Sequence, residues 1–408
     1  MSSRHHRPSD LLFRPLDLPC GVVMPNRLGK AAMSDSLGDG GGTPTEAQMR
    51  LYERWGEGGV GLSIVGEVQG DPTSAEKPGN LVLTSTSDQA AFREFASRGS
   101  VEGTQLWLQL GHAGAMAHPP IGTPAGPSPL DVPGLRSVAL SRDEVAALPD
   151  AFARTARLAR DLGFGGVEVH AAHGFLLSQF LSPLFNRRTD DYGGDIAGRC
   201  RLLLEVVEAV RCAVGPAFPI GVKLNATDQL EGGLTSEDAL AVVAALDDTS
   251  IDLLDISGGT YFPGAKPASD AAGSGPYFVA FAEHARRRTT KPIMVTGGFK
   301  TRSQAIDALA SGAVDVVGLA RSLVLDPLLP QRWREAAVAD VAFPRFVDPP
   351  EGGVTAWYTM RLTELGEDRE GKAETTLADA IAAYERRDEE RVVIWRRRFG
   401  SCGDRLER

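Results

Sequence analysis

The amino-acid sequence predicts a single (β/α)8 TIM barrel, a closed ring of eight parallel strands surrounded by helices. Eight short runs rich in apolar and β-branched residues follow one another before the chain changes character near Ala342. Most of these runs are continuously apolar, which is typical of strands that are covered on both faces. The 408 residues do not require a second domain, because barrels of this class can exceed about 400 residues when they carry insertions.

Residues that start helices separate the expected strands. Ser141 and Glu144 form a capping box, and Thr235 and Thr301 are expected to cap two further helices. The helices expected after these residues are 145–162, 236–246 and 302–311. The expected strands are 28–33, 61–66, 104–110, 166–170, 220–224, 253–257, 293–296 and 314–319.

Two stretches fall outside this repeating pattern. Residues 111–140 follow the third strand and are rich in Gly and Pro, and an insertion at this end of a barrel favours a substrate lid over an idle loop. After residue 342 a Pro-rich stretch leads to a charged helical tail. We therefore expect a barrel of residues 1–341 and an extension of residues 342–408 that packs on the barrel or forms an oligomer contact. We assign this extension no chemistry.

Composition and charge limit the classes of partner. The chain is 42% hydrophobic and 24% charged, as in ordinary globular proteins. Its net charge of -10 opposes binding to nucleic acid or an anionic membrane, because phosphate polyanions are repelled. No stretch resembles a signal peptide or reaches the roughly 18 apolar residues of a membrane span. We expect a cytoplasmic protein with a small-molecule substrate, and homo-oligomers are possible.

Two histidines follow the fourth expected strand. His170 ends this strand and His173 comes three residues later, so both imidazoles can converge at the C-terminal mouth of the barrel. Two N–H donors at this place could grip one carbonyl or phenolate oxygen and stabilise negative charge as it develops. The alternative is a pair of hydrogen-bonded histidines at the start of a loop. No metal is expected, because the chain offers no suitably spaced third ligand.

The histidines belong to a longer pattern of residues. Around them it comprises His170 to Gly174, residues 177–183, Asn186, Arg187, Arg188, Asp190, Tyr192, Gly193, Gly194 and Arg199. Elsewhere it comprises Pro25, Asn26, Arg27, Gln109, His112, Gly297, Gly298, Asp315, Gly318, Arg321, Asp326 and Pro327. This pattern, which extends from about residue 18 to residue 330, resembles that of the old yellow enzyme family.

The resemblance implies a non-covalent FMN that NAD(P)H reduces in the pocket that also receives the second substrate. That substrate would be an α,β-unsaturated carbonyl or a similar electron-poor compound, with hydride leaving flavin N5. No G-x-G-x-x-G stands between a strand and a helix, so a separate dinucleotide-binding domain is not expected. The implied cofactor-binding residues are Ala32, Met33, Ser34, Gly66, Gln109, Lys223, Gly297, Gly298, Gly318, Ala320 and Arg321.

Several of these residues have a physical rationale and an alternative. The glycines allow backbone N–H groups to approach an anion and Arg321 supplies a charged fork, which together describe a phosphate site after strands seven and eight. Ala320 can contribute its N–H only if its φ is negative. Gln109 suits the flavin pyrimidine edge but could be structural, and Ser34 could tune the flavin or simply end a strand. A buried Lys223 needs a partner, either the reduced flavin or a carboxylate.

Phe175 departs from the family pattern and is the third candidate catalytic position. Relatives usually carry here the tyrosine that protonates Cα, and a positioned general acid is typically worth about 10² to 10⁴ in rate. Tyr192, Tyr261, Tyr358 or a water could replace it. An ene-reductase is the leading hypothesis. The alternative is a flavin-dependent isomerase or dehydrogenase, because slow protonation lets hydride return. A flavin-carrying binding protein and a lyase that uses Lys223 are further alternatives.

Overall fold

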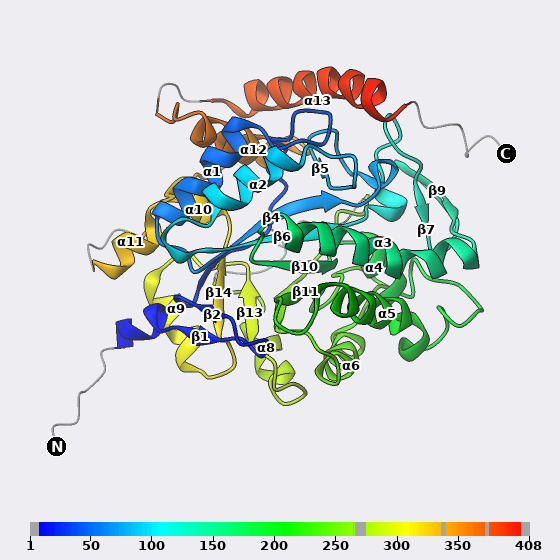
Figure 1. Cartoon of the computed structure of the whole chain (residues 1–408), viewed down its shortest axis with the longest axis horizontal. Helices are drawn as coiled ribbons and strands as arrows, with labels where there is room; N and C mark the ends of the chain where they lie inside the picture. Colours follow the sequence, from blue (N-terminus) through cyan, green and yellow to red (C-terminus); the bar gives the residue numbers. More distant parts are fainter. Residues whose placement is uncertain (1–7, 264, 266–274, 336–339, 372–374, 401–408) are drawn as a thin grey trace.

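The computed structural model describes residues 8–263, 265, 275–335, 340–371 and 375–400. Within these residues eight parallel strands form a closed barrel, in which the last strand pairs with the first (Figure 1). The strands are β3 (Leu28–Lys30), β4 (Leu62–Gln69), β6 (Gln105–Gly111), β10 (Gly166–Ala171), β11 (Ile220–Asn225), β12 (Leu253–Ser257), β13 (Ile293–Thr296) and β14 (Val316–Leu319). The predicted fold and all eight predicted strands are confirmed.

Helices follow the strands and cover the outside of the barrel. Ser141 caps α3 through the predicted capping box with Glu144, while Thr235 and Thr301 cap α6 and α9. The helices are α1 (Glu46–Glu57), α2 (Gln89–Gly99), α3 (Arg142–Asp161), α4 (Leu176–Leu181), α5 (Ile196–Val214), α6 (Ser236–Asp247), α8 (Val279–Ala285), α9 (Arg302–Ala310), α10 (Arg321–Leu325) and α11 (Leu329–Arg334). Among the described residues, no helix is both long enough and apolar enough to cross a membrane.

The interior of the barrel changes from apolar to polar along its axis. A hairpin of β1 (Leu16–Asp17) and β2 (Val23–Met24) packs with inward side chains at the start of the strands. The barrel residues of this cluster include Ile64, Trp107, Leu253, Met294 and Val316. Because alternate residues of a strand share a face, the next inward positions are Gly66, Gln109, Asp255, Thr296 and Gly318. Polar groups therefore gather at the C-terminal end of the strands, where barrel active sites lie.

The residues after β6 build a small sheet. It consists of β7 (Ala125–Gly126), β8 (Leu130–Val132) and β9 (Leu135–Ala139). The Arg188 guanidinium donates to the carbonyl oxygens of Pro127 and Leu140, and Arg187 donates to that of Pro129. These two arginines therefore fasten the insertion to the segment between α4 and α5. A role for the insertion as a substrate lid stays a prediction.

The C-terminal residues form α12 (Gly353–Gly366) and α13 (Leu377–Phe399). Helix α13 is the long red helix at the top of Figure 1. Trp395 is completely buried in a cluster with Ala75, Val82 and Ile121, and Arg391 donates to the carbonyl oxygen of Ser36. One face of the charged helix therefore packs on loops at the C-terminal end of the barrel strands. The domain boundary near residue 341 and an oligomer contact stay predictions.

Candidate active site

His170 and His173 lie side by side at the end of β10. Their ring centroids are 5.2 Å apart and their planes are inclined by 75°. His173 has a left-handed backbone with φ of 61°, a conformation in which histidine and asparagine are enriched. Its amide donates to Oδ1 of Asn225 at 3.1 Å, which holds the turn against β11. The two imidazoles therefore share one side of the barrel mouth.

Both imidazoles are neutral at neutral pH. Desolvation lowers the pKa of His170 well below its usual value and that of His173 to about 3. Nδ1 of His170 is buried and has no hydrogen-bond partner among the described residues. An unpaired buried lone pair is less costly than an unpaired N–H, which favours the tautomer with the proton on Nε2. His170 can thus donate from Nε2, and Nε2 of His173 lies 3.0 Å from Oγ of Ser257.

A layer of buried polar side chains lies inside the barrel next to His170. Nε2 of Gln109 donates to Oε1 of Glu168 at 2.7 Å. The Lys223 ammonium is paired with the Asp255 carboxylate, which also accepts a 2.7 Å hydrogen bond from the Thr296 hydroxyl. Desolvation raises the pKa of Glu168 to about 8, and the nearby Lys223 opposes this shift. These contacts fix a polar layer across five strands.

The buried Lys223 has a carboxylate partner, which is one of the two alternatives expected from the sequence. Asp255 stands in register on the neighbouring strand and supplies the counter-charge. The sequence does carry a signal for Asp255. An acidic residue inside the apolar run of β12, two residues from both Leu253 and Ser257, marks a polar inward position. Lys223 can still contact a flavin, since one ammonium has three donors.

Glycines and one arginine form a corner at the ends of β13 and β14. Gly298 has φ of 81°, and a Cβ there would lie 1.9 Å from the carbonyl oxygen of Gly275, so only glycine fits. Gly297 also has a positive φ, of 120°, and Ala320 has the negative φ, -130°, that its predicted role requires. With the described residues Arg321 makes no salt bridge and no hydrogen bond. Such a donor set is typical of an anion site.

Arg321 is held from the C-terminal extension. Its guanidinium carbon lies 5.0 Å from the ring centroid of Tyr358, a buried residue of α12. A cation–π contact orients a guanidinium without occupying its N–H groups. The fork of Arg321 thus stays available to a ligand at the corner that also includes Gly318.

Four predicted residues lie where the chain after β3 passes the middle of β4. Ala32, Met33 and Ser34 follow β3, and Ser34 forms an isolated parallel bridge with Gly66. A Cβ on Gly66 would lie 3.1 Å from Cβ of Ala32 and from the backbone of Met33. The missing side chain therefore lets the two strand ends approach closely on the side of the mouth formed by β3 and β4.

Phe175 cannot donate a proton. The side chain is 1% exposed and packs in a small apolar cluster beside the insertion. Of the three tyrosines that could replace it, Tyr192 donates to Glu205 on α5 at 3.0 Å and Tyr358 stacks on Arg321. Tyr261 has its ring centroid 5.9 Å from that of Phe175. It is the member of this trio that borders the histidine pair.

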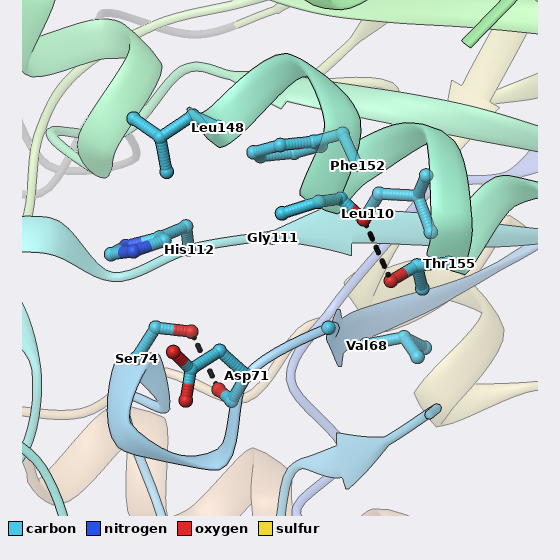
Figure 2. A pocket seen from close by; sticks show the side chains of 11 residues that line it. Val68, Asp71, Ser74, Leu110, Gly111, His112, Leu148, Phe152 and Thr155 are labelled. Carbon is cyan, nitrogen blue, oxygen red and sulfur yellow. Dashed lines mark hydrogen bonds between the residues drawn. The ribbon is translucent and has the colours of Figure 1, made fainter. Parts of the chain in front are cut away.

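A separate hollow lies between α3 and the ends of β4 and β6 (Figure 2). Leu148, Phe152 and Thr155 line it from α3, and His112 lines it from the end of β6. Nδ1 of His112 accepts a 3.0 Å hydrogen bond from the amide of Gly114, so this residue of the family pattern positions the start of the insertion. Among the described residues, none of the predicted site residues lines this hollow.

Comparison with known proteins identifies the family of this barrel. Residues 11–338 match the model of the NADH:flavin oxidoreductase / NADH oxidase family. The chain belongs to this family. It is 35% identical over 360 residues to a protein of Neonectria sp. (strain DH2) named NADH-dependent flavin oxidoreductase iliE. That match covers 78% of this chain and 46% of the relative.

Solved structures agree with the assignment of this chain to the flavin oxidoreductase family. Morphinone reductase shares 27% identity at a TM-score of 0.70, over 82% of this chain and 91% of that one. An old yellow enzyme homologue from Zymomonas mobilis shares 25% identity at a TM-score of 0.72, over 85% and 98% of the two chains. The predicted family and the predicted enzyme class are confirmed.

Tyr358→Leu is expected to weaken flavin binding by the oxidoreductase about 10-fold, since a cation–π contact is worth roughly 0.5–2 kcal/mol. Tyr358→Phe keeps the aromatic face and is the matched control. Titration of the apoprotein with FMN, followed by quenching of flavin fluorescence, measures the effect. An unchanged dissociation constant in the leucine variant would show that Arg321 is held by other contacts.

The lowered pKa of His112 predicts that the stability difference between the wild type and a His112 variant depends on pH. Desolvation lowers its pKa to about 4, whereas the unfolded side chain titrates near 6.5. Between these pH values the unfolded chain binds the extra proton, so this group's contribution to the free energy of unfolding falls as the pH decreases. His112→Asn keeps an acceptor for Gly114 but does not titrate. Relative to the wild type, the free energy of unfolding of the variant should therefore increase by up to about 1.4 kcal/mol per pH unit as the pH is lowered from 6.5 towards 4. Urea unfolding measures this difference. A difference that is constant with pH would contradict this.

Proposed function

We propose that the protein is an FMN-dependent ene-reductase that uses NADH or NADPH to saturate an α,β-unsaturated carbonyl compound. The observation that carries this proposal is the pair of neutral imidazoles, 5.2 Å apart, at the mouth of a barrel with a buried polar layer. Two neutral N–H donors that bind one carbonyl oxygen stabilise the charge that develops there during hydride transfer to Cβ.

FMN is the flavin that the glycine–arginine corner suits. A phosphate group would find the fork of Arg321 and the backbone of Gly298 and Ala320, while Gln109 and Lys223 would hold the pyrimidine edge of the ring. Ala32, Met33, Ser34 and Gly66 would form the side of the pocket beside β3 and β4. Bound FMN supplies a two-electron carrier that takes hydride from the nicotinamide and gives it to the substrate.

The histidines orient the substrate and stabilise the charge that develops on its carbonyl oxygen. Nε2 of His170 donates to the carbonyl oxygen from a fixed position at the end of β10. His173 exchanges its contact with Ser257 for the same oxygen, at little cost, because one hydrogen bond replaces another. Neither imidazole needs to change protonation state, so this binding step should be independent of pH between about 6 and 8.

An isomerase is the second candidate, and the burial of Phe175 favours it. A substrate whose enolate found no proton donor would persist until the hydride returned, and its double bond would be rearranged without consumption of NAD(P)H. The names of the relatives support the reductase, since one is an NADH-dependent flavin oxidoreductase and another is morphinone reductase.

Anaerobic mixing separates these two functions. The protein is reduced with an equimolar amount of NADH and then mixed with 2-cyclohexenone or a labelled β-substituted enone. A reductase reoxidises its flavin and forms an equimolar amount of saturated ketone, whereas an isomerase leaves the flavin reduced and rearranges the substrate. Failure of every enone to reoxidise the flavin or to rearrange would overturn both.

A further inference from the structure

Tyr261 stands beside the histidine pair and is one of the three tyrosines that the sequence left open as replacements for a proton donor at position 175. Its ring centroid lies 5.9 Å from that of His173 and 5.9 Å from that of Phe175. The residue follows β12, a strand that contributes Asp255 to the polar layer. A phenol is thus adjacent both to the proposed carbonyl clamp and to the position that lacks its usual acid.

The turn that carries Tyr261 is joined to the turn that carries His173. The Tyr261 amide donates to the carbonyl oxygen of His173 at 3.1 Å, and Thr260 forms a parallel bridge with His173. Gly174 has φ of 81°, and a Cβ there would lie 2.1 Å from Oγ1 of Thr260. Because glycine permits this approach, the same contacts hold together the two turns that carry the phenol and the imidazole.

The phenol of Tyr261 is exposed beside the histidine pair at the barrel mouth. The side chain is 61% accessible, whereas Phe175 is 1% accessible. The charges that act on the phenol are those of Glu76, Glu67 and Arg321. Glu67 belongs to β4, which lies opposite β12 in the ring of strands. Desolvation and the two carboxylates raise the pKa of the phenol to about 12, and Arg321 opposes this shift.

We propose that Tyr261 is the catalytic acid that delivers the proton to Cα, in place of the residue at position 175. This inference rests on the proposed ene-reductase function. When hydride forms the new C–H bond at Cβ, the electron pair of the double bond moves to the carbonyl oxygen held by His170 and His173. The O–H bond of Tyr261 then breaks and a C–H bond forms at Cα. Water restores the phenol, and NAD(P)H is the two-electron reductant.

The properties of the phenol suit this step. With its raised pKa the Tyr261 phenol remains protonated at neutral pH, so the proton is present when the enolate forms. A C–H bond next to a carbonyl is a far weaker acid than a phenol, so the transfer is favourable. Rapid trapping of the enolate prevents hydride return, and the protein then acts as a reductase although Phe175 carries no proton.

Tyr261→Phe and the double variant Tyr261→Phe/Phe175→Tyr test the proposal. The single variant should slow reoxidation of the reduced flavin by 2-cyclohexenone about 10² to 10⁴-fold, the range of a lost general acid. The rate at which NADH reduces the flavin of this variant should not change. The double variant returns a phenol to a ring position 5.1 Å from His170 and should recover at least about 10-fold of the lost rate. Tyr192→Phe, which removes a phenol bonded to Glu205, is the matched control.

A binding measurement excludes a purely structural effect. The dissociation constant of 2-cyclohexenone for the oxidised protein, followed by the flavin absorbance, should be the same in the wild type and in Tyr261→Phe. Unchanged reoxidation in the single variant overturns the inference and leaves the ene-reductase function intact. Loss of enone binding in parallel with the rate assigns Tyr261 to binding and also overturns it. If no enone reoxidises the reduced flavin of the wild-type protein, the proposed ene-reductase function itself is wrong.

Discussion

Replacement of Arg321 by alanine is expected to weaken FMN binding roughly 100-fold and to yield protein that loses its flavin during purification. Arg321 has no carboxylate partner among the described residues. It belongs to the corner that contains Gly298 and Gly318, where a side chain larger than that of glycine would clash. Charge-assisted hydrogen bonds contribute about 1.5–3 kcal/mol each, so the loss of a fork exceeds about 2.7 kcal/mol. Titration of the apoprotein with FMN measures the change.

Riboflavin provides the control for this prediction, because it lacks the phosphate. Arg321→Ala should bind riboflavin as the wild type does, and Arg321→Lys should be intermediate for FMN, since an ammonium keeps the charge and loses the fork. Arg93→Ala, on the exposed face of α2, should change neither affinity. Equal FMN affinity of Arg321→Ala and wild type would place the phosphate elsewhere.

Replacement of His173 by leucine is expected to slow flavin reoxidation by an enone about 10² to 10³-fold. This is the range for loss of one donor to a developing oxyanion. The imidazole is neutral, so the effect is loss of a hydrogen bond and not loss of a positive charge. Stopped-flow absorbance under anaerobic conditions measures the step, and flavin reduction by NADH in the same variant shows that the cofactor site is intact.

His173→Asn is the matched control for the leucine variant. Asparagine tolerates the left-handed backbone with φ of 61° and keeps an N–H donor, so its rate should remain within about 10-fold of the wild type. Leucine loses the donor and is also disfavoured in this backbone conformation. Equal rates for the leucine variant and the wild type would mean that His170 alone binds the carbonyl oxygen.

The barrel could be predicted from the sequence because its signals are local. Each strand is an apolar run between helix signals, and each capping residue acts within one turn. The errors lie at strand ends, where partners are distant. The strand predicted at 28–33 ends at Lys30. Beyond it, the chain pairs with β4 only through an isolated bridge between Ser34 and Gly66. Strand β4 continues to Gln69 because Val68 pairs with Leu81 of β5 (Leu81–Val82).

The contacts that define the candidate site could be predicted only in part. Family resemblance indicates which residues gather at the mouth, but not how they pair. The Lys223–Asp255 pair and the stacking of Tyr358 on Arg321 join separate elements, and residue 358 lies beyond the matched residues 11–338. The choice of Tyr261 over Tyr192 likewise depends on the direction in which a loop carries its side chain, which sequence spacing does not encode.

The C-terminal helix shows the same limit. Its local composition is charged, and residues 377–399 alone do not indicate which surface the helix covers. The partners of the buried Trp395 ring are Ala75, Val82 and Ile121, more than 270 positions earlier in the chain. The apolar residues Val392, Trp395 and Phe399 of this charged helix become a packing signal only when the surface that receives them is known.

The absorbance and mass spectra of the flavin released from the purified protein test most directly whether this barrel mouth is an FMN site. We predict an equimolar, non-covalent flavin with the mass of FMN, released by denaturation and taken up again by the apoprotein. A protein that purifies without flavin and takes up neither FMN nor riboflavin, or one that prefers FAD, would contradict the account.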